Sequence, residues 1–284
     1  MTGSVLTTTN HDRDNFGLTY VYPVVSRRAG GVSIGINLNP NNACNWACVY
    51  CQVPNLTRGG APDIDLSLLE SELRHMLQQV LHGDFMVQHV PPEARRLNDV
   101  AFSGNGESTS AACFAEAIDV VERQLRQFGL LGQLKVVLIT NGSLMARPQV
   151  QQALCRLAAI NGEVWFKLDR GSTADVLQVN QVNLTMDAVL RHLAIAADLC
   201  PTWVQTCMFA IDGQLPSGTA VDAYLQCLRQ VLADGVKLQG VLLYGLARPS
   251  LQPAAGRLSA APEAWMSALA EKIKALGLFV KLSA

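Results

Sequence analysis

Hydrophobic residues of this chain fall into two alternating patterns, short continuous runs and longer segments with helical spacing. Short apolar runs bounded by polar or Gly-rich stretches are typical of buried β-strands, whereas recurrence every three or four residues is typical of amphipathic helices. Six runs of the first kind predict strands within residues 31–40, 98–108, 134–142, 163–172, 202–213 and 236–250. A last short run at 278–283 closes the chain.

Segments with helical spacing separate these predicted strands. In residues 65–83, Leu, Met and Val side chains recur at three- and four-residue spacing. Asp65 stands at the expected N-cap position of this helix, and Gly83 follows its last turn. The same reasoning predicts helices at 114–129, 148–159 and 219–234, a helix that begins near Thr185 and a helix that opens at Pro262.

The alternation of strands with helices predicts parallel strands joined by helical crossovers, either as an open sheet or as a barrel. In such folds the functional residues gather where strands end and loops begin. Polar, Gly-rich or charged clusters stand at these strand ends: NPNNACNWAC, SGNGEST, TNGS, KLDRGS and GLARPS. We find no linker, repeat or low-complexity block, so we expect one domain.

Composition narrows the class of protein. The 284 residues are 49% hydrophobic and 16% charged, which is typical of a globular chain. The formal net charge of −1 does not favour a broad, charge-driven nucleic-acid surface, and the basic pair Arg27 and Arg28 is expected at a solvated surface. No apolar run has the roughly 18 to 20 residues of a membrane helix. The N-terminus lacks the apolar core of a signal peptide, so we expect a cytoplasmic protein with no membrane partner.

Eight cysteines in this length are too dilute for a disulfide scaffold. Three of them crowd into ACNWACVYCQ, residues 43–52. The other five have mostly apolar neighbours and are expected to be small core residues: Cys113, Cys155, Cys200, Cys207 and Cys227.

Cys44, Cys48 and Cys51 are spaced four and three residues apart, and three interpretations are open. On a helix, this spacing would place three small side chains on one apolar face, although the turn-forming NLNPNN before them favours a loop. A structural zinc site needs four Cys or His ligands, and no second pair of ligands follows nearby. An iron–sulfur cluster is held by thiolates, and three cysteines on a four-iron cluster leave one iron open for a small molecule.

Other strand ends carry further candidate residues. FSGNGEST is Gly-rich but lacks the Lys-Ser/Thr pair of a phosphate-binding loop. Lys167 and Asp169 are two residues apart and would share a face on a strand, as an exposed ion pair or as part of the mouth of a binding site. In the next strand Gln205 and Cys207 would share a face with Trp203, so Gln205 is predicted to face a lumen.

The segment CNWACVYC resembles the CxxxCxxC signature of the radical S-adenosylmethionine (SAM) superfamily, including the aromatic Tyr50 before the third cysteine. SGNGEST resembles the Gly-rich motif that follows the second strand in that superfamily, with Asn105 in place of its middle glycine. From about Val24 to Ser250, with gaps, the chain further resembles stand-alone iron–sulfur oxidoreductases related to wyosine-type tRNA synthases. We find no counterpart of the extra domains of those synthases, which does not favour a tRNA substrate. We find no second cysteine cluster of the kind that peptide-modifying members use, so we expect no auxiliary cluster.

The resemblance implies a partial (β/α)6 TIM-like barrel of parallel strands in a single α/β domain. It implies an N-terminal extension at 1–23 and a radical SAM core at 24–284, which ends in a helix and a short strand. A [4Fe–4S] cluster is expected on Cys44, Cys48 and Cys51, with SAM chelated at the open iron. The residues expected around SAM are Tyr50, Ser103, Gly104, Asn105, Gly106, Glu107, Asn141, Lys167, Asp169, Gln205, Gly245, Leu246 and Ala247.

The chemistry that the resemblance implies is a one-electron reduction that cleaves SAM to methionine and a 5′-deoxyadenosyl radical, which abstracts hydrogen from a substrate. That substrate is a small molecule, a nucleoside or tRNA base, or a partner protein on which a radical is installed. The reductant is expected to be a one-electron carrier such as flavodoxin or ferredoxin. A non-catalytic iron–sulfur or zinc-binding module is the alternative, and the sequence assigns no catalytic residue.

Overall fold

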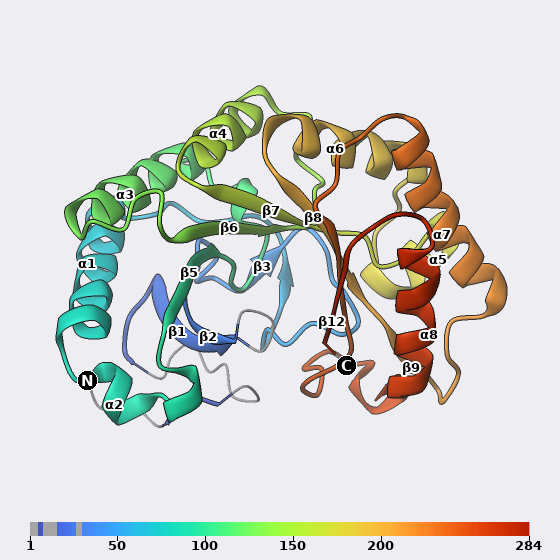
Figure 1. Cartoon of the computed structure of the whole chain (residues 1–284), viewed down its shortest axis with the longest axis horizontal. Coiled ribbons are helices and arrows are strands. Elements are labelled where there is room, and N and C mark those ends of the chain that lie inside the picture. The colour runs from blue at the N-terminus through green and yellow to red at the C-terminus, as the bar shows by residue number, and fades with distance from the viewer. Residues whose placement is uncertain (1–4, 8–15, 27–29, 284) are drawn as a thin grey trace.

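Eight strands of the described chain form one curled sheet, in which the strand order follows the chain (Figure 1). The computed structural model describes residues 5–7, 16–26 and 30–283, so Arg27 and Arg28 lie outside the described residues. β1 is antiparallel to β2, and the other neighbouring pairs are parallel. From one edge to the other, the strands are β1 (Val21–Ser26), β2 (Gly31–Ile36), β5 (Leu97–Phe102), β6 (Lys135–Thr140), β7 (Gly162–Lys167), β8 (Thr202–Cys207), β10 (Gly240–Tyr244) and β12 (Val280–Ser283).

Helices cover the outer, convex face of this sheet, because each crossover between two parallel strands runs through at least one helix (Figure 1). Neighbouring helices pack together, α1 on α3, α3 on α4, α4 on α6 and α6 on α7. The edge strands β1 and β12 do not pair with each other, so the described strands form an open, partial barrel. The crossover helices are α1 (Leu66–His82), α2 (Phe85–His89), α3 (Phe114–Gln127), α4 (Pro148–Ala159), α5 (Thr173–Asn180), α6 (Met186–Leu199), α7 (Gly218–Ala233) and α8 (Glu263–Lys274).

Two small ladders lie in the connections between the main strands. β3 (Ala43–Cys44) pairs in parallel with β4 (Thr57–Arg58), inside the cysteine-rich segment. β9 (Phe209–Ile211) continues the chain after β8 and pairs antiparallel with β11 (Leu258–Ala260). Both ladders follow the carboxyl end of a sheet strand, so they belong to the layer of loops at that edge.

Strand side chains alternate between two apolar environments. The residues that point outward join the main core under the helices, among them Val100, Phe102, Val136, Leu138, Val164 and Phe166. Those that point inward form a separate small cluster within the barrel, made of Ala101, Val137, Trp165 and Leu242 with Ile139 and Trp203 packed against it. The lumen is therefore filled below the carboxyl ends of the strands.

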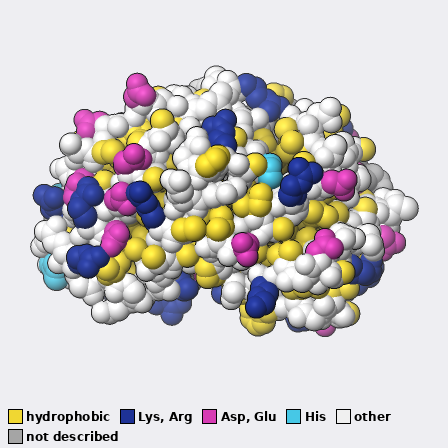
Figure 2. Space-filling model, turned by 90° about the horizontal axis from the view of Figure 1, so that it is seen from above, with side chains coloured by type: hydrophobic (Ala, Val, Ile, Leu, Met, Phe, Trp, Pro, Cys, Tyr) yellow, Lys and Arg dark blue, Asp and Glu magenta, His cyan; other side chains and the backbone are white. Residues whose placement is uncertain are grey.

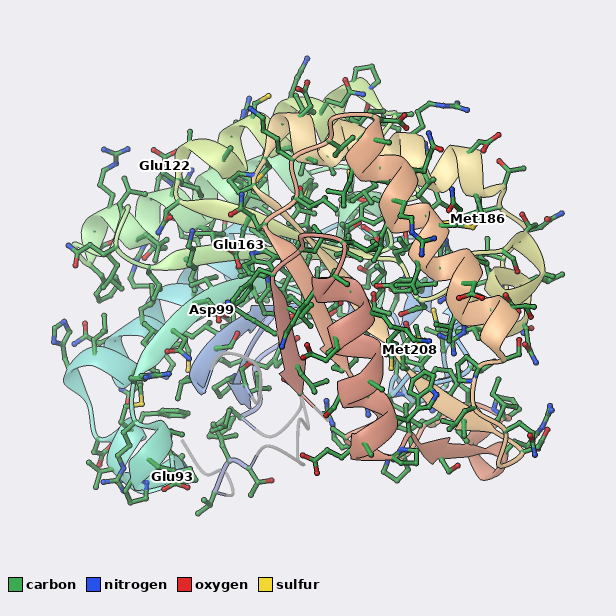
Figure 3. The ribbon with its side chains drawn as sticks, turned by 45° about the vertical axis from the view of Figure 1, so that its right-hand side comes forward. Glu93, Asp99, Glu122, Glu163, Met186 and Met208 are labelled. Atoms are coloured by element: carbon green, nitrogen blue, oxygen red, sulfur yellow. The ribbon has the colours of Figure 1, made fainter. Side chains whose placement is uncertain are left out.

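Acidic side chains near the amino ends of the strands have partners within the protein. Figure 3 labels two of them, Asp99 on β5 and Glu163 on β7. The buried Asp99 accepts a hydrogen bond from the Ser33 hydroxyl. Glu163 accepts a 2.8 Å hydrogen bond from the indole N–H of Trp165, and its carboxylate lies 3.7 Å from the Lys135 ammonium. These groups stabilise the end of the barrel opposite the loop layer.

The outer surface carries charges of both signs. Figure 2 shows Lys and Arg side chains interspersed with Asp and Glu, and with hydrophobic atoms, over the face seen from above Figure 1. No helix in the described ranges is long and apolar enough to cross a membrane. The cytoplasmic location stays a prediction.

The predicted order of strands and helices is confirmed, and with it the partial TIM-like barrel. α1 begins directly after the expected N-cap, where Asp65 accepts hydrogen bonds from the backbone N–H groups of Ser67 at 2.9 Å and Leu68 at 3.0 Å. The apolar patterns do not predict β1 or α5. β1 runs across the expected boundary between residues 23 and 24. This strand therefore contains residues of both the expected N-terminal extension and the expected core, and the division of the chain into these two parts stays a prediction.

Three of the five cysteines outside the cluster are buried as expected, namely Cys200, Cys207 and Cys227. Cys113 is half-buried. The expectation is wrong for Cys155, which is exposed on α4 beside the buried Leu154. The rotation of about 100° between successive helical residues turns Cys155 away from the core.

The buried stripe of α1 can be tested with two leucines of the same helix. Leu73 is fully buried, whereas Leu68 is 40% exposed. We expect Leu73→Ala to lower the free energy of unfolding by about 2 to 5 kcal/mol, because it leaves a cavity in the core. Leu68→Ala should change that free energy by no more than about 0.5 kcal/mol. Urea denaturation of both variants measures the difference, and equal losses would contradict the packing of α1.

Candidate cofactor-binding cavity

A cavity of about 260 Å³ opens at the carboxyl edge of the sheet. Its walls come from the cysteine-rich segment, the loop after β5, and the ends of β6, β7, β8 and β10. The loops bring together fifteen of the sixteen residues predicted for the site: Cys44, Cys48, Tyr50, Cys51, Ser103, Gly104, Asn105, Gly106, Glu107, Asn141, Lys167, Gln205, Gly245, Leu246 and Ala247. Asp169 is the exception.

The cysteine-rich segment is a loop that other elements hold in place. No helix forms over residues 43–52, so the interpretation of the cysteines as one helix face is wrong. The backbone N–H of Val49 donates to the carbonyl of Val179 at 2.8 Å. The hydroxyl of Ser250 donates to the Val49 carbonyl at 2.7 Å and to the Cys51 carbonyl at 3.1 Å. Segments more than 100 residues away therefore fix where the three thiols stand.

The three cysteines are free and half-buried, and they line one wall of the cavity. Burial raises the pKa of the Cys44 thiol to about 11 and that of the Cys48 thiol to about 12, because a thiolate loses its hydration there. A thiolate at this site thus needs a positive group beside it, and a bound metal centre deprotonates its cysteine ligands. The backbone N–H of Trp46 already donates to Cys44 Sγ at 3.4 Å.

A single metal ion does not match this arrangement. Within the described residues, no three Cys, His, Asp or Glu side chains gather closely enough to hold one ion. Thiolates on a four-iron cluster bind different irons and stand farther apart than the ligands of one zinc ion. As the structure places them, the three thiols thus do not form a ready site for one ion.

The Gly-rich loop after β5 packs directly on the segment that leads to the cysteines. A Cβ atom on Gly104 would stand 2.4 Å from Asn37 Oδ1, and one on Gly106 would stand 2.1 Å from the Ala43 carbonyl oxygen. The Asn37 side chain accepts the backbone N–H of Asn105 at 3.0 Å. Both glycines are thus required where the loop backbone packs against Asn37 and against Ala43, the residue before Cys44.

Glu107 is buried behind the Gly-rich loop, with one carboxylate oxygen more fully bonded than the other. Oε1 accepts the hydroxyls of Thr109 at 2.6 Å and Thr140 at 2.7 Å, while Oε2 accepts the backbone N–H of Asn141 at 2.7 Å. Burial raises the pKa of Glu107, and the hydrogen bonds from Thr109 and Thr140 oppose that effect. Oε2 accepts one hydrogen bond within the described chain, so it keeps capacity for a further donor.

Asn141 is mostly engaged by the protein itself. Its amide donates to Asn45 Oδ1 at 2.8 Å, and its own Oδ1 accepts from the backbone and hydroxyl of Ser143 at 3.0 Å and 2.7 Å. Asn45 in turn donates to the Ser143 hydroxyl at 2.7 Å. Asn141 therefore ties the loop after β6 to the residue next to Cys44.

Lys167 lies in the cavity wall at the end of β7, where its ammonium contacts two phenols. Nζ donates to Tyr50 Oη at 3.2 Å and to Tyr244 Oη at 3.4 Å. Burial alone would lower the pKa of Lys167, but Tyr244 and Asp169 outweigh burial and hold that pKa above its ordinary value. The cavity thus contains a fixed positive charge close to the cysteine wall.

Asp169 does not line the cavity, because β7 ends at Lys167 and strand alternation does not continue to it. It is 3% exposed, so the exposed ion pair is wrong. Oδ2 accepts the Tyr50 hydroxyl at 2.5 Å, and Oδ1 accepts the backbone N–H of Cys207 at 2.8 Å. Asp169 thus supports the cavity wall from behind, through Tyr50.

The sequence patterns miss several lining residues, including Trp46, Ile139 and Tyr244. Strand alternation, which places Cys207 on the same face as Gln205, contains the signal for Tyr244. Cys207 is two residues beyond the lumen-facing Gln205, and Tyr244 is its neighbour in the β8–β10 register. Cys207 is thus both a core residue and part of the cavity wall.

Some buried polar atoms of cavity-lining residues have no hydrogen-bond partner in the described chain, among them Trp46 Nε1, Asn105 Oδ1 and Gln205 Oε1. Buried polar groups in folded proteins are almost always hydrogen-bonded. A donor and two acceptors from residues of one cavity wall therefore fit a polar ligand that offers both kinds of group.

No family model matches the chain. The chain is 24% identical over 186 residues to a UPF0026 protein of Helicobacter pylori strain J99. This alignment covers 61% of this chain and 53% of that protein. It is also 25% identical over 169 residues to a GTPase Obg of Brachyspira hyodysenteriae. That alignment covers 58% of this chain and 21% of the Obg protein. The chain thus spans about half the length of the UPF0026 protein.

Solved structures with a similar fold include radical SAM enzymes. TYW1 with a bound lysine–pyruvate adduct superposes with a TM-score of 0.57 at 13% identity, covering 88% of this chain and 74% of that one. A radical SAM methyltransferase from Sphaerobacter thermophilus gives 0.54 at 14% identity, covering 89% and 66%. Streptococcus suis SuiB bound to SAM gives 0.53 at 11% identity, covering 90% and 47%. The fold resemblance predicted from CNWACVYC is confirmed.

The close approach at Gly106 can be tested by adding one methyl group. We expect Gly106→Ala to lower the free energy of unfolding by about 1 to 3 kcal/mol, because its Cβ meets the Ala43 carbonyl and the loop must move. Gly218→Ala is the matched control, since nothing lies within 4 Å of its added Cβ. Urea denaturation compares the two, and an unaffected Gly106→Ala protein would show that the loop contact is not tight.

Proposed function

We propose that this chain is a radical SAM enzyme that holds a [4Fe–4S] cluster on Cys44, Cys48 and Cys51 and binds SAM in the adjoining cavity. The observation that carries the proposal is that these three thiols and the Gly-rich loop face one cavity at the carboxyl edge of the partial barrel. Fold likeness to radical SAM enzymes supports it.

The residues present fit both groups. Three thiolates on three irons leave the fourth iron open for the amino and carboxylate groups of SAM. When bound and reduced, the cluster supplies the electron that cleaves SAM and so generates a 5′-deoxyadenosyl radical for hydrogen abstraction. The protein contributes binding, orientation and exclusion of water.

The cavity side chains divide into groups that accept and groups that donate. Asn105 Oδ1 and Glu107 Oε2 are acceptors for the ammonium of SAM, and Gln205 Oε1 is an acceptor for a ribose hydroxyl. The Lys167 ammonium donates to a carboxylate or ribose oxygen. Backbone at Gly245 to Ala247 also borders the cavity, beside the adenine in this arrangement.

The substrate is proposed only as a class, a nucleoside or other small molecule, with a partner protein as the alternative. The electron would come from a one-electron carrier such as flavodoxin or ferredoxin. A GTPase activity is not favoured, because no Gly-Lys pair of a phosphate-binding loop occurs anywhere in the sequence.

Cysteine-dependent cleavage of SAM tests the proposal directly. We expect the protein, reconstituted anaerobically with iron and sulfide and reduced with dithionite, to convert SAM to 5′-deoxyadenosine. Cys44→Ala/Cys48→Ala/Cys51→Ala should lose both the cluster absorbance and the product, because the iron ligands are gone. Cys113→Ala/Cys155→Ala is the matched control and should retain both, since neither residue lines the cavity. No cleavage by a cluster-loaded wild-type protein would favour the non-catalytic module.

Gln205 tests the assignment of SAM to this cavity. We expect Gln205→Leu to weaken SAM binding by roughly threefold to tenfold, the equivalent of one net hydrogen bond. Cluster content should stay unchanged, because Gln205 is no iron ligand. Equilibrium binding of SAM to the reconstituted protein measures the effect, with Gln178→Leu on the exposed side of α5 as control. Equal affinities in the two variants would remove Gln205 from the site.

A further inference from the structure

Asn180, the last residue of α5, joins that helix to the cysteine loop. It is 1% exposed. Its carbonyl oxygen accepts the backbone N–H of Ala47 at 3.3 Å, and its side-chain Nδ2 lies 3.3 Å from Cys48 Sγ. Both contacts are made within the chain itself.

The chemistry around this amide determines which end faces the sulfur. Nδ2 also donates to Asp169 Oδ2, at 2.9 Å. The Asp169 carboxylate can only accept hydrogen bonds when ionised, as can a thiolate. The opposite orientation would place the amide oxygen against both acceptors. Nδ2 therefore donates one hydrogen to the Asp169 carboxylate and the other to Cys48 Sγ.

Asp169 is itself held rigidly. The Tyr50 hydroxyl and the Cys207 backbone N–H donate to it at 2.5 Å and 2.8 Å, and the Arg170 guanidinium donates to its backbone carbonyl at 2.7 Å. These donors come from the cysteine loop, β8 and the residue after Asp169. The carboxylate thus cannot follow Asn180 if the amide turns, and the amide keeps one direction.

The hydrogen bonds to the sulfurs of Cys44 and Cys48 come from different kinds of donor group. At Cys44 the donor is the backbone N–H of Trp46, which almost any residue type would supply. At Cys48 the donor is a side chain, so its presence depends on residue 180 being asparagine. Hydrogen bonds to ligand sulfurs set the reduction potentials of iron–sulfur clusters, because they stabilise the form with more negative charge.

We propose that Asn180 is a positioning residue that donates a hydrogen bond to the Cys48 thiolate and thereby raises the reduction potential of the cluster. This inference rests on the proposed function, because it requires a cluster on Cys44, Cys48 and Cys51. Asn180 would touch neither SAM nor substrate, since it is not among the residues that line the cavity.

The test is an anaerobic redox titration of the reconstituted protein without SAM, followed by electron paramagnetic resonance of the reduced cluster. We expect Asn180→Leu to shift the midpoint potential to a more negative value than that of the wild-type protein. Asn180→Ala should shift the midpoint potential in the same direction. It replaces Asn180→Leu in the experiment if the leucine side chain prevents cluster assembly.

Two variants of α5 separate tuning of the cluster from simple disturbance of the helix. Gln178→Leu makes the same kind of amide-to-leucine exchange at an exposed position. Val179→Ala leaves a small cavity at a residue that is 1% exposed, without removing a side-chain hydrogen bond. Both should keep the wild-type midpoint potential, even if Val179→Ala lowers the stability of the fold.

The outcomes distinguish this inference from the proposed function. A wild-type protein that assembles no cluster on the three cysteines overturns both. A cluster that cleaves SAM but has the same midpoint potential in wild type and in either Asn180 variant overturns only the inference. Both Asn180 variants could lose the cluster while the Val179→Ala protein keeps it. That result would show that Asn180 is needed for cluster assembly instead of setting the midpoint potential, and it would also overturn the inference.

Discussion

From β2 to β12, neighbouring strands of the main sheet run in the same direction, and the site depends on that parallelism. Parallel pairing places the carboxyl end of each strand at one edge, so the polar loop that follows each strand meets the others there. The lumen below is filled by a small apolar cluster that includes Trp165 and Leu242. The cavity accordingly lies in the loop layer above this cluster.

Within that layer, the loops pack against one another and are joined by hydrogen bonds. Gly104 and Gly106 let the loop after β5 lie directly against Asn37 and Ala43. Asn141 bonds the loop after β6 to Asn45, next to the first cysteine of the cluster motif. The Gly-rich motif thus has a structural task that does not involve a ligand, which is to bring its backbone against the cysteine-rich segment.

Behind the cavity wall, the buried carboxylate of Asp169 joins three parts of the chain. It accepts hydrogen bonds from Tyr50, Asn180 and the backbone of Cys207. A buried carboxylate is costly unless it is fully hydrogen-bonded, so these donors are held in fixed positions. On the cavity side, the Lys167 ammonium contacts the same Tyr50 hydroxyl. Tyr50 therefore lies between the Lys167 ammonium, which lines the cavity, and the Asp169 carboxylate, which supports the cysteine loop.

Local patterns in the sequence predict the order of strands and helices, the N-cap at Asp65 and the place of the cysteine loop after the first parallel strand. These features follow from periodicity and capping, which depend on nearby residues. The position of Asp169 outside the cavity follows instead from the fold, because strand alternation predicts a shared face with Lys167 while β7 continues, and β7 ends at Lys167. The Asn180 contact to Cys48 spans 132 residues, and no local pattern relates two positions so far apart. Such contacts arise from how α5 packs beside the cysteine loop, and packing of that kind depends on the whole fold.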